Sequence, residues 1–368
     1  MRKKALISAS LAAGLMLGVS AYPAVEQIEN RQGITAQAAT GTTTDGWEYS
    51  ANDTNCVITG AKSTLSGDVT IPASITLSDG KTLPVTRIGT NSLRSNSKLT
   101  GLTIPEGVTE IGEYAISECP NLKKVTLPAS LQIIEGSAFN QDKALETVEM
   151  PKGVIEISGF AFSNCTSLKN ITLPDSLTTI GRDAFHSCTS LKSINIPGTI
   201  STLGPWAFAE CSTLETVKIA NGIQSFSSTF EDCTQLKEIT FPASVTTLSY
   251  PFDEECTHLT SVTIENPDCK INFRIFKAEE ETIIYGYEGS TAQQYCEANG
   301  EALHAVFKSI GEKPEPQKDY GEFCDANGDG KVDVVDAQLV LIYYVEDIAG
   351  NKPSWYQITG NPKAPDAP

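Results

Sequence analysis

The chain has 368 residues, of which 40% are hydrophobic, and its formal net charge is −18. This hydrophobic content is enough for a folded core and too high for a disordered chain. Nucleic-acid-binding proteins need a basic face for the phosphates, and anionic membranes also attract basic segments, so the acidic balance argues against both partners. Histidine occurs only three times, which leaves little material for His-based catalytic sites.

Residues 1–21 follow the pattern of an export signal. Arg2, Lys3 and Lys4 precede an apolar run of about 15 residues, and a small-x-small cleavage site follows. Cleavage could follow Ala21 or, in a longer peptide, Ala38 or Ala39, so we assign 1–39 to a signal peptide and leader. The apolar run is shorter than the roughly 20 residues that a membrane-spanning helix needs. We therefore expect an exported protein without membrane insertion, held at a bacterial surface only through another module.

A unit of nearly constant length repeats through most of the chain. One copy, residues 168–190, reads LKNITLPDSLTTIGRDAFHSCTS. The step between equivalent positions equals the length of this copy, except that the step from Ala220 to Pro242 is one residue shorter and the first step, after Pro72, is longer because an insertion lies there. The aligned positions are Pro105, Pro128, Pro151, Pro174, Pro197, Ala220, Pro242 and Glu265.

The physical logic of the unit predicts a stacked coil. Alternating apolar residues form a short strand, and Pro174 ends it because proline cannot donate to a strand ladder. Two further apolar residues point inward on the return segment, and an Ala-Phe pair fills the interior. One unit cannot bury these side chains alone, whereas stacked neighbours share one core. The residues concerned in this copy are Leu168, Ile171, Leu173, Leu177, Ile180, Ala184 and Phe185.

This motif resembles the BspA-like, or treponemal-type, leucine-rich repeat family. The resemblance implies a leucine-rich-repeat β-solenoid with short parallel strands on one face and irregular turns on the other. It covers residues 47–308, with an N-terminal cap at its start and a C-terminal cap at 282–300, where Ser290 can begin a helix that Gly300 ends. Family members often act as surface adhesins, so the resemblance also implies an extracellular binding role.

Six of the ten cysteines occupy one position of the repeat. Asn96 and Asp142 hold the same position in other coils, which favours buried turn hydrogen bonds over redox chemistry. We expect a ladder of unpaired thiols, although neighbouring coils are close enough for a disulfide. The pairing of Cys56, Cys269, Cys296 and Cys324 cannot be read, and no CxxC or His spacing indicates zinc. The ladder cysteines are Cys119, Cys165, Cys188, Cys211, Cys233 and Cys256.

Two surfaces could bind a partner. The strand face carries two polar rows without aromatic residues, which is more typical of a solvated sheet than of an interface. The turn position two residues before the buried Phe instead carries an aromatic residue in every second coil. These side chains either form an exposed stripe for protein or sugar contact or pack between the coils. The candidates are Tyr114, Phe160, Trp206 and Tyr250.

The segment after Phe307 differs in composition. Residues 309–323 read as a linker, 324–352 as a loop and helix, and 353–368 as a tail. The loop matches the EF-hand rule for calcium, with oxygen ligands at alternating positions, a glycine at the sharp turn, and Asp in place of the usual final Glu. The ligands would be Asp325, Asn327, Asp329, the backbone carbonyl of Lys331, Asp333 and Asp336.

This segment resembles one half of a dockerin module. The resemblance implies calcium as a cofactor and a cohesin-bearing scaffold protein as a partner, as in cellulosome-like assemblies. Dockerins normally carry two such halves, and the tail holds no second loop. Leu341 and Ile342 give the following helix an apolar face that is a candidate partner surface.

The first hypothesis for function is therefore a secreted, non-catalytic binding protein whose repeat domain recognises an extracellular protein or glycan. The alternative is a structural spacer, or a free adhesin whose half-dockerin binds calcium but no cohesin. An enzyme is not expected, because GxSxG, HExxH and P-loop motifs are missing. Glu149 and Glu238, the carboxylates of the strand face, lie four coils or ~19 Å apart, too far for a glycosidase pair.

Overall fold

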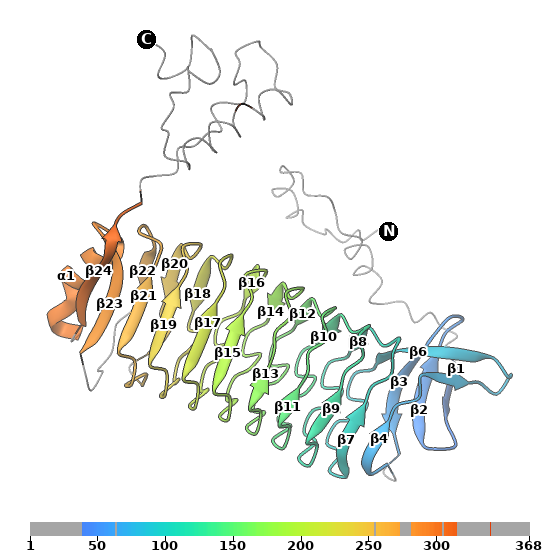
Figure 1. Cartoon of the computed structure of the whole chain (residues 1–368). Coiled ribbons are helices and arrows are strands. Elements are labelled where there is room, and N and C mark those ends of the chain that lie inside the picture. The colour runs from blue at the N-terminus through green and yellow to red at the C-terminus, as the bar shows by residue number, and fades with distance from the viewer. Residues whose placement is uncertain are drawn as a thin grey trace, which may run out of the picture. The chain divides into compact units, whose positions relative to one another are not determined.

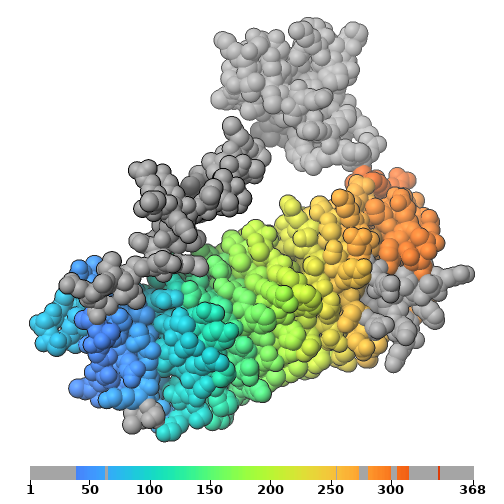
Figure 2. Space-filling model, turned by 180° about the vertical axis from the view of Figure 1, so that it is seen from behind, coloured from blue at the N-terminus to red at the C-terminus, as the bar shows by residue number. Residues whose placement is uncertain are grey.

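A computed structural model describes residues 39–62, 65–253, 255–272, 281–303, 305–314 and 339. The chain divides into two units, Met1–Ile310 and Gly311–Pro368, and the first is a solenoid whose coils stack in chain order (Figure 1). Figure 2 shows the side chains of successive coils in close contact along this stack. The described part contains no helix that is long and apolar enough to cross a membrane. The predicted β-solenoid is therefore confirmed within this unit.

Each coil contributes one strand to a first parallel sheet. In most of these strands a buried Ile, Val or Leu lies between exposed neighbours, as in β15, because alternate side chains point to opposite faces. Pairing advances by one repeat from strand to strand, from Thr147 to Asn170 for example. These strands are β7 (Leu99–Thr103), β9 (Lys124–Thr126), β11 (Thr147–Val148), β13 (Asn170–Ile171), β15 (Ser193–Ile196), β17 (Thr216–Ile219), β19 (Glu238–Phe241) and β21 (Ser261–Ile264).

A second strand of two or three residues in each coil forms the opposite sheet. Its buried residue stacks on the same residue of the next coil, so that Ile134 pairs with Ile157 and Ile157 with Ile180. These strands are β8 (Glu110–Ile111), β10 (Ile133–Ile134), β12 (Glu156–Ile157), β14 (Thr179–Ile180), β16 (Thr202–Leu203), β18 (Ser225–Ser227), β20 (Thr247–Ser249) and β22 (Lys270–Asn272).

Each sheet is interrupted once, at different coils. The first sheet divides between β13 and β15, and the second between β16 and β18. The second break coincides with the shortened step of the sequence. Trp206 is the third residue after Leu203, whereas Ser228 is only the second after the equivalent Phe226. The amide of Ser227 accordingly bonds to the side chain of Thr229 and not to the previous coil.

Strands cap the N-terminal end, as predicted. The first three pair antiparallel, and the cap begins before residue 47. The insertion after Pro72 is a hairpin in which Ser74 pairs with Pro84. The strands of this end are β1 (Ala39–Thr42), β2 (Trp47–Ala51), β3 (Cys56–Ala61), β4 (Gly67–Thr70), β5 (Ser74–Thr76) and β6 (Thr82–Ile88).

The C-terminal cap consists of β23 (Thr282–Glu288), α1 (Thr291–Leu303) and β24 (Ala305–Glu312). Ser290 caps the helix as predicted, since its hydroxyl accepts the amide of Gln293. Two boundaries were wrong. The helix continues through Gly300, because one glycine costs only about 1 kcal/mol in a helix. The strand β24 includes residues 309–312, which the sequence assigned to the linker.

A column of stacked phenylalanines fills the core. Neighbouring rings are 5.0–6.0 Å apart and nearly parallel. The backbone holds this stack in register, because the amide of Phe139 bonds to the carbonyl of Ala161 in the next coil. Each coil is therefore aligned with its neighbour through the Phe residue at the centre of the core. The stacked rings belong to Phe139, Phe162, Phe185, Phe208 and Phe230.

The cysteine ladder lies beside this column. Each of its six thiols is buried and donates to a carbonyl oxygen of the preceding coil at 3.2–3.3 Å. Burial raises the pKa of Cys211 and of Cys256 to about 12. All nine described cysteines are unpaired, whereas Cys324 lies outside the described residues. The thiols are thus inert hydrogen-bond donors, as the shared position with Asn and Asp indicated.

Asp142 replaces a ladder cysteine and is fully buried. Its Oδ1 accepts the amide of Cys119 at 2.7 Å, but its Oδ2 has no hydrogen-bond partner. Burial holds the pKa of this carboxyl well above its ordinary value. The folded state therefore keeps the proton at a pH where the unfolded chain has already lost it.

We predict that Asp142→Asn removes a pH dependence of stability. Below the ordinary aspartate pKa both states are protonated and the wild type is at its most stable. As the pH rises, the unfolded chain ionises first and the wild type loses stability until the pH passes the folded pKa. Urea unfolding should show Asp142→Asn more stable than wild type by roughly 1–3 kcal/mol at pH 7, with the gap shrinking towards pH 4.

The control is Asp175→Asn, at an exposed turn. It should unfold with the pH dependence of the wild type. A constant gap between Asp142→Asn and wild type from pH 4 to pH 7 would show that the buried carboxyl does not titrate as argued.

Candidate functional site

One turn position of the repeat forms a continuous row along the solenoid, which we call the turn row. It lies just after the second-sheet strand of each coil. Large aromatic residues alternate along it with small polar ones. Its members are Asn91, Tyr114, Ser137, Phe160, Asp183, Trp206, Ser228 and Tyr250.

Every residue of the turn row has a left-handed backbone, with φ between 49° and 60°. Asparagine and aspartate tolerate this conformation, but it is uncommon for bulky residues and costs about 1–2 kcal/mol for an L-residue. Asn91 and Asp183 therefore suit the turn, whereas Phe160 and Trp206 strain it. Strained residues that a fold retains often serve a function, so the aromatic members are candidates for one.

The aromatic members differ in exposure. Phe160 and Tyr250 are 42% and 55% exposed, and Ile310 is the third exposed large hydrophobic residue among those described. Tyr114 and Trp206 are half-buried. The alternative that all four rings pack between the coils is thus wrong for Phe160 and Tyr250. Whether the rings bind a partner stays a prediction.

Arginines from the preceding coil cover the two half-buried rings. The Arg94 guanidinium lies 4.9 Å from the centre of the Tyr114 ring, and that of Arg182 lies 4.5 Å from the centre of the Trp206 ring. The Trp206 indole also donates to Glu231 at 2.7 Å. The sequence interpretation missed both arginines, although Arg182 directly precedes a turn-row position and coil alignment places it beside Trp206.

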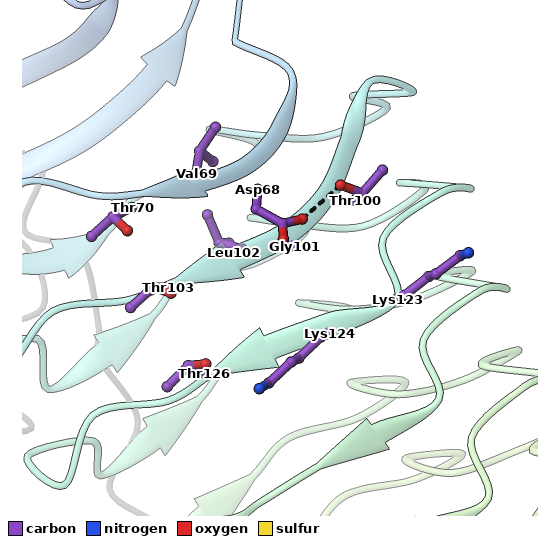
Figure 3. Close-up of a pocket in the computed structure, with 10 residues that line it drawn as sticks. All are labelled: Asp68, Val69, Thr70, Thr100, Gly101, Leu102, Thr103, Lys123, Lys124 and Thr126. Atoms are coloured by element: carbon purple, nitrogen blue, oxygen red, sulfur yellow. Dashed lines mark hydrogen bonds between the residues drawn. The ribbon is translucent and has the colours of Figure 1, made fainter.

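The strand face is polar and mostly exposed, as predicted. A hollow of about 470 Å³ lies where Gly101 interrupts the row of longer side chains. Figure 3 shows Asp68 bonded to Thr100 beside Gly101, with Lys123 and Lys124 on the next coil. A Cβ at residue 101 would lie 2.7 Å from Oδ1 of Asp68. The hollow is shallow and open to solvent, and none of the residues that line it is aromatic.

A Ser-His-Glu cluster escaped the sequence interpretation. Oγ of Ser187 donates to Glu210 at 2.5 Å and lies 3.1 Å from Nδ1 of His186. The same bond recurs near the N-terminal end, where Ser95 donates to Glu118. The serine proton is directed to a carboxylate and not to the imidazole base that a nucleophile needs. The cluster is therefore a bridge between coils, and it gives no support for catalysis.

The predicted calcium ligands lie outside the described residues. These are Asp325, Asn327, Asp329, Lys331, Asp333 and Asp336, and the apolar helix residues Leu341 and Ile342 lie outside them as well. Within the described ranges, no group of three His, Cys, Asp or Glu residues is arranged to hold a metal ion. The calcium site remains an expectation from the sequence.

We predict that Phe160→Asn stabilises the isolated chain. Asparagine tolerates the left-handed backbone that phenylalanine strains, and much of the lost ring is in contact with water. Urea unfolding at low protein concentration should give a free energy of unfolding ~0.5–1 kcal/mol higher than wild type. The same change at Thr126, an exposed strand position, should give no gain because strands disfavour asparagine. A clear loss for Phe160→Asn would mean that the ring is a core element.

A family model for the BspA type leucine-rich repeat region matches residues 73–174 and 155–282, in six copies. No curated protein matches the chain. Among solved structures, a leucine-rich repeat protein of T. pallidum is 27% identical, covers 53% of this chain and 90% of its own, and has a TM-score of 0.48. One from Bacteroides ovatus is 22% identical, with 76% and 79% covered and a TM-score of 0.45.

The pneumococcal vaccine antigen PcpA is 16% identical, with 76% of this chain and 99% of its own covered and a TM-score of 0.32. The family match spans more than half of the chain, and its repeats coincide with the observed coils. The chain therefore belongs to the BspA-type leucine-rich repeat family.

Proposed function

We propose that this protein is a secreted, non-catalytic binding protein whose solenoid recognises an extracellular protein or glycan through the turn row. The observation that carries the proposal is the exposure of Phe160 and Tyr250 at backbone positions that disfavour large residues. Exposed aromatic side chains supply large contact area at low entropic cost, and binding energy concentrates on such residues. The strand face offers no aromatic residue in its two rows and is the weaker candidate.

The chemistry of the turn row suits a neutral ligand. The two arginines that cover its half-buried rings already bond to acidic neighbours, Arg94 to Glu118 and Arg182 to Asp183. An anionic ligand would have to compete with these carboxylates and with the negative charge of the whole chain. A ligand that offers apolar faces and hydrogen-bonding groups, such as a protein loop or an uncharged sugar, meets no such penalty.

The C-terminal segment would supply attachment. We propose that the loop from Asp325 to Asp336 binds calcium and that the following helix docks on a cohesin-bearing scaffold. Support comes from the sequence alone, through oxygen ligands at five EF-hand positions and the glycine at the turn. The single loop favours a weaker or shared docking mode, because half a module has little core of its own.

Replacing two turn-row rings tests the recognition surface. The double change Trp206→Ala with Tyr250→Ala should weaken adhesion to bacterial and host-matrix surfaces by about tenfold or more, as loss of hot-spot residues does. Quantitative surface binding with the full exported chain measures it. The matched control is Asn195→Ala with Lys218→Ala, two paired residues of the strand face. Loss of adhesion in the control alone would assign recognition to the strand face.

Calorimetry tests the attachment module. Titrating the full chain with calcium should show one binding event, and Asp329→Ala should abolish it because position 5 of the loop loses its carboxylate. Asp366→Ala, in the tail, is the control. Adding cohesin domains in calcium should then give a second heat. Calcium binding without a cohesin response would leave a free adhesin with a calcium-stabilised tail, and the absence of calcium binding would contradict the module altogether.

A further inference from the structure

The insertion after Pro72 builds one wall of a pocket at the N-terminal end. Its hairpin of β5 and β6 lies beside the hairpin of β1 and β2, and Figure 1 shows β1 and β6 together at this end of the solenoid. Residues 42–45 and Tyr49 of one hairpin face Pro72 and residues 74–78 of the other across a cavity of about 430 Å³, which we call the cap pocket. Insertions in repeat proteins often lie on the binding face, so this departure from the repeat is a candidate site.

Both walls of the cap pocket are fixed in place. In the turn between β1 and β2, the amide of Thr43 donates to the carbonyl of Trp47 at 2.8 Å. The Thr43 hydroxyl accepts the Trp47 amide in return, and the Trp47 ring is buried in the core. The opposite hairpin is anchored by buried Ile75 and by Lys81, whose ammonium donates to the carbonyl of Asp53. A pocket between rigid walls loses little conformational entropy when a ligand binds.

One aromatic ring forms part of the wall. Tyr49 pairs with Gly41 across the β1–β2 ladder, and a Cβ at residue 41 would lie 2.5 Å from the phenol oxygen and 2.7 Å from Cζ of Tyr49. The ring therefore lies over the bare backbone of the glycine, in a space that any other residue would fill. The pairing of β2 with β3 also shifts by one residue at Tyr49, and such bulges recur beside sites where a strand orients a side chain. Both features favour a fixed ring at the pocket.

The rest of the lining is rich in hydroxyl groups. Four exposed hydroxyls and one exposed carboxylate have no hydrogen-bond partner among the described residues. Hydroxyls both donate and accept, so they are available to a ligand of either kind. The carboxylate accepts charge-assisted bonds that are roughly twice as strong as neutral ones. These groups belong to Thr42, Thr44, Ser74, Ser78 and Asp45.

We propose that the cap pocket binds a neutral hexose unit of a saccharide. One face of a hexose ring carries C–H groups that suit the negative face of an aromatic ring, and the edge of the hexose carries hydroxyls. The pocket offers the matching groups: the Tyr49 ring, several hydroxyls and the Asp45 carboxylate. Its volume lies within the range of about 300–1,000 Å³ that small ligands occupy. The inference adds a site at the cap and does not rest on the turn row.

The charge of the pocket selects against acidic sugars. Its described lining contains one carboxylate, Asp45, and no Lys, Arg or His. The nearby ammonium of Lys81 is bonded to a backbone carbonyl. The carboxylate of a uronic acid would therefore approach Asp45 without a compensating cation, on a chain whose formal net charge is −18. A neutral sugar meets no such repulsion.

Saturation-transfer NMR with the full exported chain tests the proposal. The neutral probes are the methyl glycosides of glucose, galactose and mannose, and methyl glucuronide is the acidic probe. At least one neutral probe should receive saturation from the protein and titrate to a defined dissociation constant. Methyl glucuronide should receive none, because like charges that face each other cost several kcal/mol.

Two variants locate the bound sugar. Ser74→Tyr places a ring in the pocket from an exposed strand position that suits tyrosine, and Asp45→Ala removes the carboxylate of the described lining. Each should raise the dissociation constant about tenfold or more. The matched controls are Thr240→Tyr and Asp53→Ala, at exposed positions outside the pocket, and both should bind as the wild type does. Thermal melts verify that all four variants fold.

Three results would overturn the inference: no saturation of any neutral probe, binding of methyl glucuronide in place of the neutral probes, or a dissociation constant unchanged in both pocket variants. The outcome is separate from that of the proposed function. The double variant Trp206→Ala with Tyr250→Ala should bind the sugar as the wild type does while its adhesion falls. Loss of sugar binding in that double variant, with both pocket variants unaffected, would assign the sugar to the turn row and contradict the site at the cap.

Discussion

The structure depends on one constraint: the residues of each coil must lie against the equivalent residues of the next coil, one repeat further along the chain. Hydrogen bonds run between coils, so an amide and its acceptor belong to different repeats, as Phe162 and Ala184 do. The stacked rings and the thiol-to-carbonyl bonds also join one coil to the next. A coil buries its apolar side chains only when the next coil is in place. Stability, register and the alignment of surface rows all follow from this repetition.

Surface rows are a by-product of that repetition. Residues at the same turn position of successive coils lie in line at a fixed rise, so their side chains form a linear array. The turn row shows the effect clearly, since alternate coils hold rings at a position where the backbone prefers asparagine or glycine. The same offset of one repeat places Ser95 beside Glu118 and Ser187 beside Glu210, and each pair forms a hydrogen bond between coils. Structural and candidate functional features thus arise by one mechanism.

The sequence was sufficient for the repeat, the solenoid core, the unpaired thiols and the helix cap at Ser290, because each rests on periodicity or on a local capping rule. It was not sufficient for features that depend on backbone conformation or on neighbours one coil away. Tyr114 and Phe160 carry no sign of a left-handed backbone, since glycine and asparagine are the usual markers. The stacking of Arg182 on Trp206 and the orphan oxygen of Asp142 appear only once the coils are stacked.

The two sheet interruptions have a consequence for how the solenoid comes apart. They fall at different interfaces: β14 still pairs with β16 where the first sheet stops, and β15 still pairs with β17 where the second stops. In a one-dimensional chain of coupled units, separate melting requires an interface where the coupling vanishes. Because the two interruptions fall at different interfaces, neighbouring coils remain paired through one sheet at each of them. The described coils therefore contain no interface without coupling. We therefore expect the described coils to unfold in one cooperative transition. The terminal coils should open first, because each has a neighbour on one side only.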